Sequence, residues 1–244
     1  MAPRPRTLPD VPLPASKRQI DLAGDRLREW WLDLNLPGEL LSTDAELRAA
    51  ALLVLDYRIG FQDPLNRVTM GVRSFVKSEG APIVVAQRLK RMVTIVRKLG
   101  RFQRMQLARM QDIGGCRAII PSRAQFEGVA ARIRKTWDVR RFDDYAAEPK
   151  STGYRAVHVV VNRRGRLIEI QLRTPLEQRW AAEVDRAGGQ LGDFLKDGFG
   201  PEEIVNAYRE LADEIARSSG ELTDEMYDRF AQIRAQVRSL AATK

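Results

Sequence analysis

Cysteine and histidine are almost absent from this chain, because its 244 residues include one of each, Cys116 and His158. A single cysteine excludes an internal disulfide and any cysteine-based metal cluster, as is typical of a reducing compartment. A single histidine cannot supply a metal site that needs several histidines. We interpret Cys116, flanked by Gly115 and Arg117, as a small core residue rather than a nucleophile.

Long hydrophobic runs are missing as well. The N-terminal sequence MAPRPRTLPDVPLPASKR has no apolar core of signal-peptide length, and no stretch approaches the ~20 apolar residues of a membrane span. We therefore expect a cytoplasmic protein with no membrane partner. Lysine and arginine total 41 against 32 acidic residues, and the net charge of +9 would attract nucleic acid, an anionic surface or phosphorylated small molecules.

Four segments with different patterns divide the chain. Residues 1–15 contain five prolines, which disfavour helix and sheet, so we predict a flexible Pro/Arg-rich tail. Residues 16–80 carry helical patterns, with Ser42 or Thr43 as one N-cap and Glu46 as its capping-box partner. Residues 81–187 form the predicted core, and 188–244 are predicted to be C-terminal helices.

The core region combines one long amphipathic stretch with several short β-rich runs. Residues 83–99, IVVAQRLKRMVTIVRKL, are predicted to be a helix that ends at Gly100. The runs CRAIIP, WDVRRFDDY, YRAVHVVVN and LIEIQLRT are typical of strands, and NRRGR between the last two predicts a hairpin that turns at Gly165. We therefore expect an α+β fold with a mixed sheet of four to five strands flanked by helices.

Carboxylates are absent from the 32 residues between Gly80 and Gln111. Eight cations lie there, namely Arg88, Lys90, Arg91, Arg97, Lys98, Arg101, Arg104 and Arg109. If this stretch is helical, four of these side chains share one face: Lys90, Arg97, Lys98 and Arg101. We give phosphate binding and a solvated basic face equal weight here.

Two carboxylates adjoin predicted strands. Asp112 precedes the run IGGCRAII, and alternation along LIEIQLRT puts Glu169, Gln171 and Arg173 on one face. That face is either exposed to solvent or the floor of a site. If Asp112 and Glu169 converge, they could hold Mg²⁺ and leave room for substrate phosphates.

The segment DDYAAEPKSTGYRAVHVVV combines residue types that suit nucleotide binding. Tyr154 and His158 fall on one face of the predicted strand, Gly153 allows a turn before it, and Lys150 offers a point charge. An aromatic ring can stack on a nucleobase. The alternative is that Tyr154 and His158 are core residues with hydrogen-bonded tips.

Together these motifs resemble the synthetase domain of the RelA/SpoT family, in particular small alarmone synthetases without a hydrolase domain. The resemblance covers residues 83 to 186. In order, it rests on RLKRMVTIVRKLGR, QDIGGCRAII, DDYAAEPKSTGYRAVHVVV and IEIQLRT, which are similar to the family's basic helix, Asp-Ile-x-Gly-x-Arg strand, Gly-Tyr-Arg-x-x-His segment and Glu-x-Gln-x-Arg-Thr strand.

This resemblance implies a nucleotidyltransferase-like sheet and transfer of the ATP β,γ-pyrophosphate to a ribose 3′-hydroxyl, usually of GDP or GTP, with release of AMP. By position it implies that ATP is bound by Arg88, Lys90, Lys98, Arg101 and Arg117. It implies Mg²⁺ at Asp112 and Glu169, with Glu169 also deprotonating the acceptor hydroxyl. The acceptor side would comprise Lys150, Tyr154, His158, Gln171 and Arg173, with Tyr154 stacked on the base.

One departure from the family pattern concerns the helix after QLRT. Where the family commonly carries a Glu-His pair, this chain has Val184 and Asp185, and Glu183 is displaced by one position. The acceptor pocket could therefore differ. Toxic members of the family, encoded with antitoxins or in prophages, transfer pyrophosphate to the 3′ end of tRNA, and the charge of +9 suits that polyanion.

Three hypotheses follow. The first is a (p)ppGpp synthetase, the second is a toxic enzyme that modifies the 3′-CCA end of tRNA, and the third is an inactive nucleic-acid-binding module. The third ranks lowest because Asp112, Tyr154 and Glu169 are all intact. We also expect a homo-oligomer and, for the toxic branch, an antitoxin partner. Alarmone hydrolysis is not expected, since a single histidine cannot build a multi-histidine metal site.

Overall fold

A mixed five-stranded sheet forms the centre of the computed structural model, which describes residues 9–34, 44–192, 195–218 and 220–243. The strands are β1 (Val84–Leu89), β2 (Gly114–Ile119), β3 (Val139–Asp144), β4 (Val157–Arg163) and β5 (Arg166–Arg173). They lie in the order β1-β2-β5-β4-β3, with β2 and β5 parallel and the other neighbours antiparallel. The predicted α+β fold with a mixed sheet is therefore confirmed.

The β4–β5 hairpin turns where the sequence predicts it. Arg164 and Gly165 form a two-residue loop, and both have positive φ angles, 52° and 73°. That combination is the one that matches the twist of antiparallel strands, and glycine adopts it without a steric cost. The hairpin keeps Glu169 and His158 on neighbouring strands, with His158 paired to Gln171.

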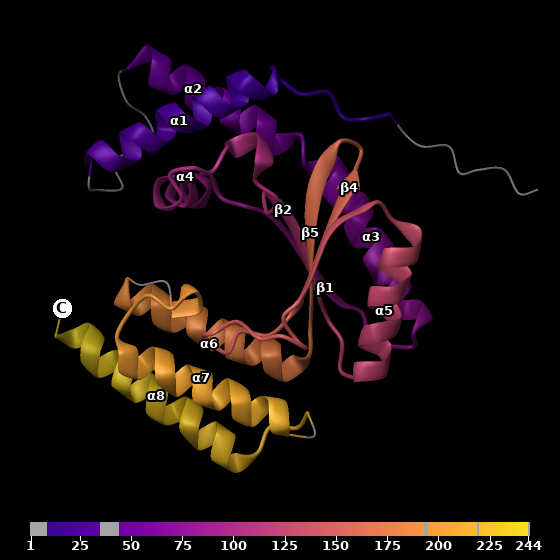
Figure 1. Cartoon of the computed structure of the whole chain (residues 1–244), viewed down its shortest axis with the longest axis vertical. Coiled ribbons are helices and arrows are strands. Elements are labelled where there is room, and N and C mark those ends of the chain that lie inside the picture. Colours follow the sequence, from indigo (N-terminus) through magenta and orange to yellow (C-terminus); the bar gives the residue numbers. More distant parts are fainter. Residues whose placement is uncertain (1–8, 35–43, 193–194, 219, 244) are drawn as a thin grey trace, which may run out of the picture.

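Helices cover the sheet in three groups (Figure 1). Helices α3 (Gln62–Ser78) and α5 (Arg123–Thr136) lie on one face. On the other side, α1 (Lys17–Leu34), α2 (Ala45–Ile59) and α4 (Met92–Arg101) gather at one end, and α6 (Pro175–Leu191), α7 (Glu202–Arg217) and α8 (Asp224–Ala242) at the other. Two short 3₁₀ helices, η1 (Leu107–Arg109) and η2 (Leu195–Asp197), complete the described elements. Among the described residues, no helix is long and apolar enough to cross a membrane.

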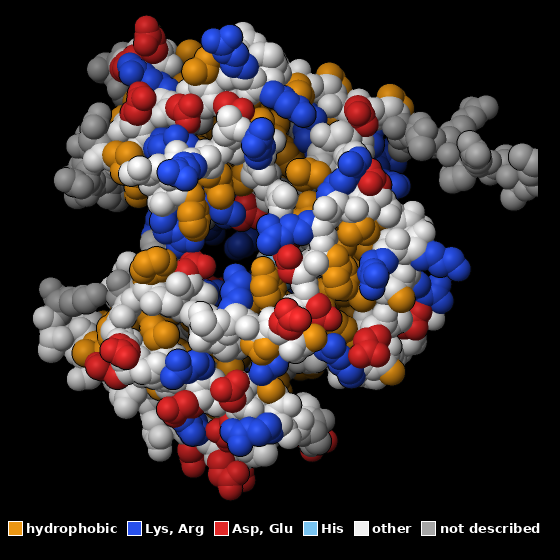
Figure 2. Space-filling view, viewed as in Figure 1, with side chains coloured by type: hydrophobic (Ala, Val, Ile, Leu, Met, Phe, Trp, Pro, Cys, Tyr) orange, Lys and Arg blue, Asp and Glu red, His pale blue; other side chains and the backbone are white. Residues whose placement is uncertain are grey.

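The two helical groups on this side leave a hollow between them, with basic side chains on its walls (Figure 2). Its floor is the sheet, where alternation separates two faces of β5. Ile168, Ile170 and Leu172 are fully buried on the α3 side, whereas Glu169 and Gln171 are only partly buried and line the hollow. The predicted alternation of β5 is confirmed, and its polar face is the floor of the hollow.

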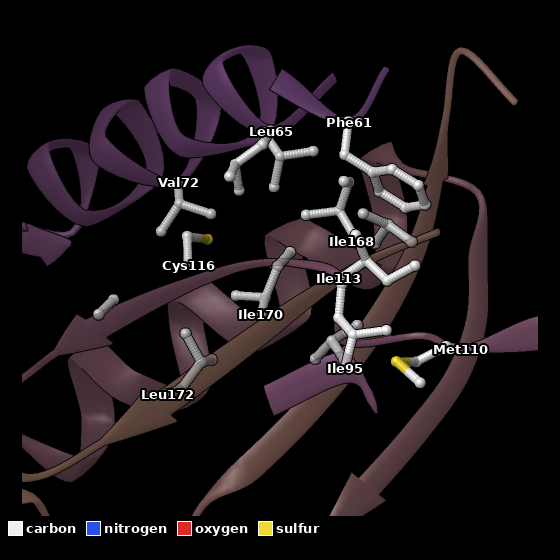
Figure 3. Close-up of a cluster of buried hydrophobic side chains, with 14 of the residues drawn as sticks. Phe61, Leu65, Val72, Ile95, Met110, Ile113, Cys116, Ile168, Ile170 and Leu172 are labelled. Carbon is white, nitrogen blue, oxygen red and sulfur yellow. The ribbon is translucent and has the colours of Figure 1, made fainter. Parts of the chain in front are cut away.

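The main core lies between α3 and the sheet (Figure 3). Phe61, Leu65 and Val72 pack against strand residues that include Cys116 and Ile168. Cys116 is 3% exposed, and burial raises the pKa of its thiol to about 12, so it is the inert core residue that the sequence predicts. A second buried cluster is formed by α6, α7 and α8.

One secondary-structure prediction is wrong. Residues 83–99 are not a single helix, because Val84–Leu89 is strand β1 and only Met92–Arg101 is helix α4. The β-branched residues at the start of this run pair with β2, as in Val84 with Ile119, and this tertiary pairing overrides the helical periodicity. The basic side chains are still brought together, since β1 runs directly into α4.

Two predictions for the N-terminal part also need correction. The N-cap of α2 is Asp44, whose carboxylate accepts hydrogen bonds from the amides of Glu46 and Leu47. Ser42 and Thr43 lie outside the described residues. The second half of the predicted tail is docked rather than free, because the amide of Val11 donates to the carbonyl of Arg164. The boundary predicted between residues 187 and 188 falls inside α6, which is continuous there.

Candidate active site

A cavity of about 630 Å³ occupies the hollow between α4, the sheet and α6. All twelve site residues predicted from the sequence line it: Arg88, Lys90, Lys98, Arg101, Asp112, Arg117, Lys150, Tyr154, His158, Glu169, Gln171 and Arg173. Lysines and arginines in its lining outnumber carboxylates by eleven to five. A concave site with this excess of positive charge concentrates polyphosphate ligands.

Asp112, one of the two carboxylates predicted to bind a metal ion, lies against two lysines of the cavity lining. Asp112 Oδ2 lies 2.8 Å from the Nζ atoms of both Lys90 and Lys98. Burial raises the pKa of Asp112, but the two ammonium groups outweigh this and bring it below the usual 3.8. Asp112 is therefore ionised at neutral pH. Its Oδ1 atom is buried and accepts no hydrogen bond from any described residue.

The second carboxylate, Glu169, lies on the sheet floor. Its Oε2 accepts a hydrogen bond of 2.7 Å from Gln171, and its Oε1 is 3.2 Å from Nδ1 of His158. Burial raises the pKa of Glu169, whereas the contacts with His158 and Gln171 lower it, and the net shift is downward from 4.5. Glu169 is consequently an ionised hydrogen-bond acceptor at neutral pH.

A chain of polar contacts leads away from Glu169. Arg173 donates to the hydroxyl of Tyr154 at 2.7 Å, and that hydroxyl is 2.6 Å from Nε2 of His158. If the Tyr154 hydroxyl donates to Nε2, then Nδ1 of His158 carries the proton and donates to Glu169. One consistent direction of donation thus fixes the tautomer and the ring orientation of His158.

The loop between β3 and β4, residues 145–156, is built around aromatic rings; it is called the acceptor loop below because the family resemblance implies acceptor binding there. Tyr154 is 4% exposed and packs 6.3 Å from Trp180, so its ring is a core residue, as one of the sequence interpretations has it. Lys150 Nζ and the Arg173 guanidinium lie 5.2 Å from the ring centroid of Tyr154. The more exposed Tyr145 lies beside it, with 6.1 Å between the ring centroids. Stacking of a base on Tyr154 stays a prediction, and it requires Lys150 to move.

Gly153 has a structural role in this loop that is testable. Its φ angle is 83°, and a Cβ at this position would lie 2.7 Å from the Cβ of Ala212 in α7. We expect Gly153→Ala to displace the loop that carries Lys150 and Tyr154, because both the backbone and the contact disfavour a side chain. The expected results are a lower melting temperature and weaker acceptor binding, with ATP binding unchanged. Calorimetry measures all three, and an unaltered acceptor affinity would contradict this role.

The guanidinium groups of Arg88 and Arg117 project from one face of the β1–β2 pair. Arg88 pairs with Gly115 and Ala86 pairs with Arg117, so the two arginines are diagonal neighbours. Both arginines line the cavity, and a guanidinium plane can stack on a planar ring, so the predicted adenine sandwich stays a prediction that this register allows. Burial, followed by the charges of Arg173 and Arg88, lowers the pKa of Arg117.

Several residues around the cavity are not predicted from the sequence. Gln178 on α6 does not line the cavity, but it accepts hydrogen bonds of 3.0 Å from both Arg117 and Arg173, which do. At the mouth of the cavity, Lys196 Nζ lies 2.6 Å from Asp185 Oδ2, and Arg101 lies 2.8 Å from Asp197. No local pattern signals these contacts, because they depend on how α6 and η2 dock against the sheet. Glu183 instead faces α8, where it contacts Arg234.

A divalent cation fits the donor set of this site. The described residues contain no group of three or more His, Cys, Asp or Glu side chains placed to hold a metal ion. Mg²⁺, however, is commonly held by one or two carboxylates together with substrate phosphates. Asp112 and Glu169 are ionised and line the same cavity, and the unpartnered Oδ1 of Asp112 is a free oxygen ligand.

The sequence is similar to known proteins. Residues 87–186 match the family model described as the region found in RelA / SpoT proteins. A GTP pyrophosphokinase of Escherichia coli K12 is 28% identical over 197 residues, which are 74% of this chain and 25% of that protein. The chain thus spans about a quarter of the length of this curated relative.

Solved structures show the same fold. Small alarmone synthetase 2 of Bacillus subtilis is 20% identical with a TM-score of 0.55, and the match covers 74% of this chain and 96% of that one. Small alarmone synthetase 1 of the same organism, bound to its product pppGpp, is 25% identical with a TM-score of 0.51, covering 68% and 96%. A GTP pyrophosphokinase family protein of Streptococcus pneumoniae is 24% identical with a TM-score of 0.54, covering 75% and 96%.

Proposed function

Since residues 87–186 of this chain are a RelA/SpoT region, we propose that the protein is an ATP-dependent pyrophosphokinase that transfers the β,γ-pyrophosphate of ATP to a ribose 3′-hydroxyl. GDP or GTP is the proposed acceptor, (p)ppGpp the product and AMP the leaving group. The name of the Escherichia coli relative and the pppGpp-bound Bacillus subtilis structure support this acceptor.

The observation that carries the proposal is the position of two ionised carboxylates between two groups of cations in one cavity. Asp112 contacts Lys90 and Lys98, whereas Glu169 is linked through His158 and Tyr154 to Arg173 on the other side. Pyrophosphate transfer brings together two nucleotides that both carry negative charge, so cations are needed on both sides. A site with a single substrate would need only one of these groups.

The ATP half-site is proposed to lie along β1 and α4. Arg88 and Arg117 would bind the adenine between their guanidinium groups. Lys90, Lys98 and Arg101 would hold the phosphates, since their ammonium and guanidinium groups line one wall. When ATP binds, its phosphates would take over the contacts that Asp112 and Asp197 now make with these side chains. Positioning of this kind is the largest contribution a protein makes to phosphoryl transfer.

Glu169 is proposed to accept the proton of the acceptor 3′-hydroxyl. Its pKa is lower than usual and it lies on the cavity floor, so its carboxylate is available at neutral pH. His158 would hold Oε1 in place, and Gln171 would hold Oε2. Mg²⁺ bound by Asp112 and Glu169 would neutralise developing charge on the transferred phosphates.

His158 is expected to act by positioning Glu169. Replacing it with alanine removes one of the two hydrogen bonds to the carboxylate and also leaves the buried hydroxyl of Tyr154 without an acceptor. We expect kcat to fall by about 10- to 100-fold, the usual effect of removing a group that orients a catalytic residue. The KM for ATP should be unchanged, because the side chains of the proposed ATP half-site are unchanged. A steady-state assay that finds the loss in the KM for ATP instead would contradict this role.

The acceptor can be identified in one experiment. The 244-residue protein is incubated with Mg²⁺ and γ-labelled ATP in the presence of GDP, GTP or deacylated tRNA, and the products are separated by chromatography and on gels. Label in a guanosine tetra- or pentaphosphate is the expected result. The alternative acceptor is the 3′ end of tRNA, which the net charge of +9 favours. Label on none of the three would contradict the proposed function.

A further inference from the structure

Lys196 reaches the cavity from outside the RelA/SpoT region, which ends at residue 186. It belongs to η2, and its Nζ lies 2.6 Å from Asp185 on α6. Its side chain is only 23% exposed, so the ammonium group is held inside the site rather than projecting into solvent.

Three contacts fix η2 in place around Lys196. Leu195 is 3% exposed and packs in the cluster formed by α6, α7 and α8. The backbone carbonyl of Lys196 accepts a hydrogen bond of 3.2 Å from the hydroxyl of Thr152, in the acceptor loop. Asp197 contacts Arg101 of α4 at 2.8 Å. The position of Lys196 is thus coupled to the acceptor loop through its own backbone.

The surroundings of Lys196 are rich in positive charge. The positive charges of Arg173 and Arg117 disfavour the charged form of its ammonium group, whereas the carboxylate of Asp185 favours it. The Nε atoms of Arg117 and Arg173 are buried and have no hydrogen-bond partner among the described residues. Arg173 is only 2% exposed, so its unused donor is costly unless a ligand satisfies it. Converging cations with unused donors are the pattern expected of an anion subsite.

We propose that Lys196 binds a phosphate group of the acceptor, together with Arg173, and so determines which acceptors the enzyme takes. This inference rests on the proposed function, and it extends the site beyond the RelA/SpoT region. The phosphate could be the 5′-diphosphate of a guanosine nucleotide or a phosphodiester near the 3′ end of an RNA. In the free protein the ammonium group of Lys196 pairs with the carboxylate of Asp185. When the acceptor binds, its phosphate replaces Asp185 as the partner of Lys196.

The charge of Lys196 is sensitive to pH in a testable range. Burial lowers the pKa of Lys196 to about 8, the nearby Arg173 and Arg117 act in the same direction, and Asp185 opposes them. Below pH 8 the side chain is a cation that can bind phosphate, and above pH 8 it becomes neutral. The charged groups that act on it are Asp185 on α6, Arg117 on β2 and Arg173 on β5.

The test compares Lys196→Ala, Lys196→Arg and Lys135→Ala, a surface control on α5, in the 244-residue protein. With GDP as acceptor, Lys196→Ala should raise the acceptor KM by about 10- to 100-fold, as expected for losing a charged hydrogen bond. The KM for ATP should not change. Wild-type kcat/KM for the acceptor should decline above pH 8. Lys196→Arg should keep the wild-type affinity for the acceptor and should not show this decline, because arginine stays charged. With guanosine as acceptor, which has no phosphate, Lys196→Ala should have no effect.

Direct binding separates this inference from the proposed function. Titration calorimetry with GDP, and with a short RNA that ends in CCA, should show weaker binding to Lys196→Ala for the ligand that is the acceptor. If the wild-type protein transfers pyrophosphate and Lys196→Ala has an unchanged acceptor KM, the inference is wrong and the proposed function stands. If no transfer occurs but Lys196→Ala still loses phosphate binding, the proposed function is wrong and the subsite stands.

Discussion

Pyrophosphate transfer should fall by about 10³-fold in Glu169→Gln, with every acceptor tested. Glutamine has the same shape as glutamate and can keep a contact with Gln171, but it cannot accept the proton of the 3′-hydroxyl. ATP binding should be retained, because the proposed ATP half-site along β1 and α4 is unchanged. Single-turnover transfer measures the first effect, and calorimetry with ATP measures the second.

The pH dependence of the wild-type enzyme gives a second readout for Glu169. Its pKa is lowered in the folded protein, so the carboxylate remains ionised until the pH falls below about 4.5. The acid limb of the rate profile should therefore lie below pH 4.5. Glu127→Gln on the exposed face of α5 is a matched control that should keep full activity. Full activity in Glu169→Gln would refute the proposed site.

Asp112→Asn should reduce transfer by about 10²- to 10³-fold and remove most of its dependence on Mg²⁺. Asparagine replaces an ionised oxygen ligand with a neutral amide, so the site loses one of its two carboxylates. The substitution also removes the partner of both Lys90 and Lys98. Those ammonium groups are then available to phosphates, and ATP binding without Mg²⁺ should be as strong as in the wild type or stronger.

Loss of the Mg²⁺ dependence together with retained ATP binding distinguishes a metal-binding role of Asp112 from a structural one. A purely structural role of Asp112 would weaken ATP binding and activity together, because the two lysines would lose their position. Asp138→Asn is the control, since Asp138 pairs with Arg140 on the surface and lies away from the cavity. Wild-type Mg²⁺ dependence in Asp112→Asn would contradict the proposed metal site. The loss of two partly buried ion pairs should also lower the melting temperature.

Local sequence patterns were sufficient to predict four of the five strands that the structure describes and the polar face of β5. Alternation in LIEIQLRT puts Glu169, Gln171 and Arg173 together, and NRRGR sets the β4–β5 hairpin, because both features depend on residues close in sequence. Residues 83–99 show where such reasoning fails. Their helical periodicity is real, but pairing of Val84–Leu89 with β2 decides the structure.

Tertiary contacts account for the parts of the site that the sequence did not predict. Gln178 bridges two arginines only because α6 packs across the sheet, and Lys196 enters only because η2 docks on the acceptor loop. A charged residue in a short turn is normally exposed, so LKDG carries no local signal of a binding site. The burial of Tyr154 likewise depends on Trp180, which lies 26 positions away in the sequence.

The most direct test is to follow the two terminal phosphates of ATP separately. The protein is incubated with Mg²⁺, GDP and ATP labelled either at the β- or at the γ-phosphate, and both products are quantified. Transfer of an intact pyrophosphate predicts equal incorporation of the two labels into the acceptor product, with one AMP released for each product formed. Incorporation of the γ-label alone, with release of ADP, would identify an ordinary kinase and contradict the central claim.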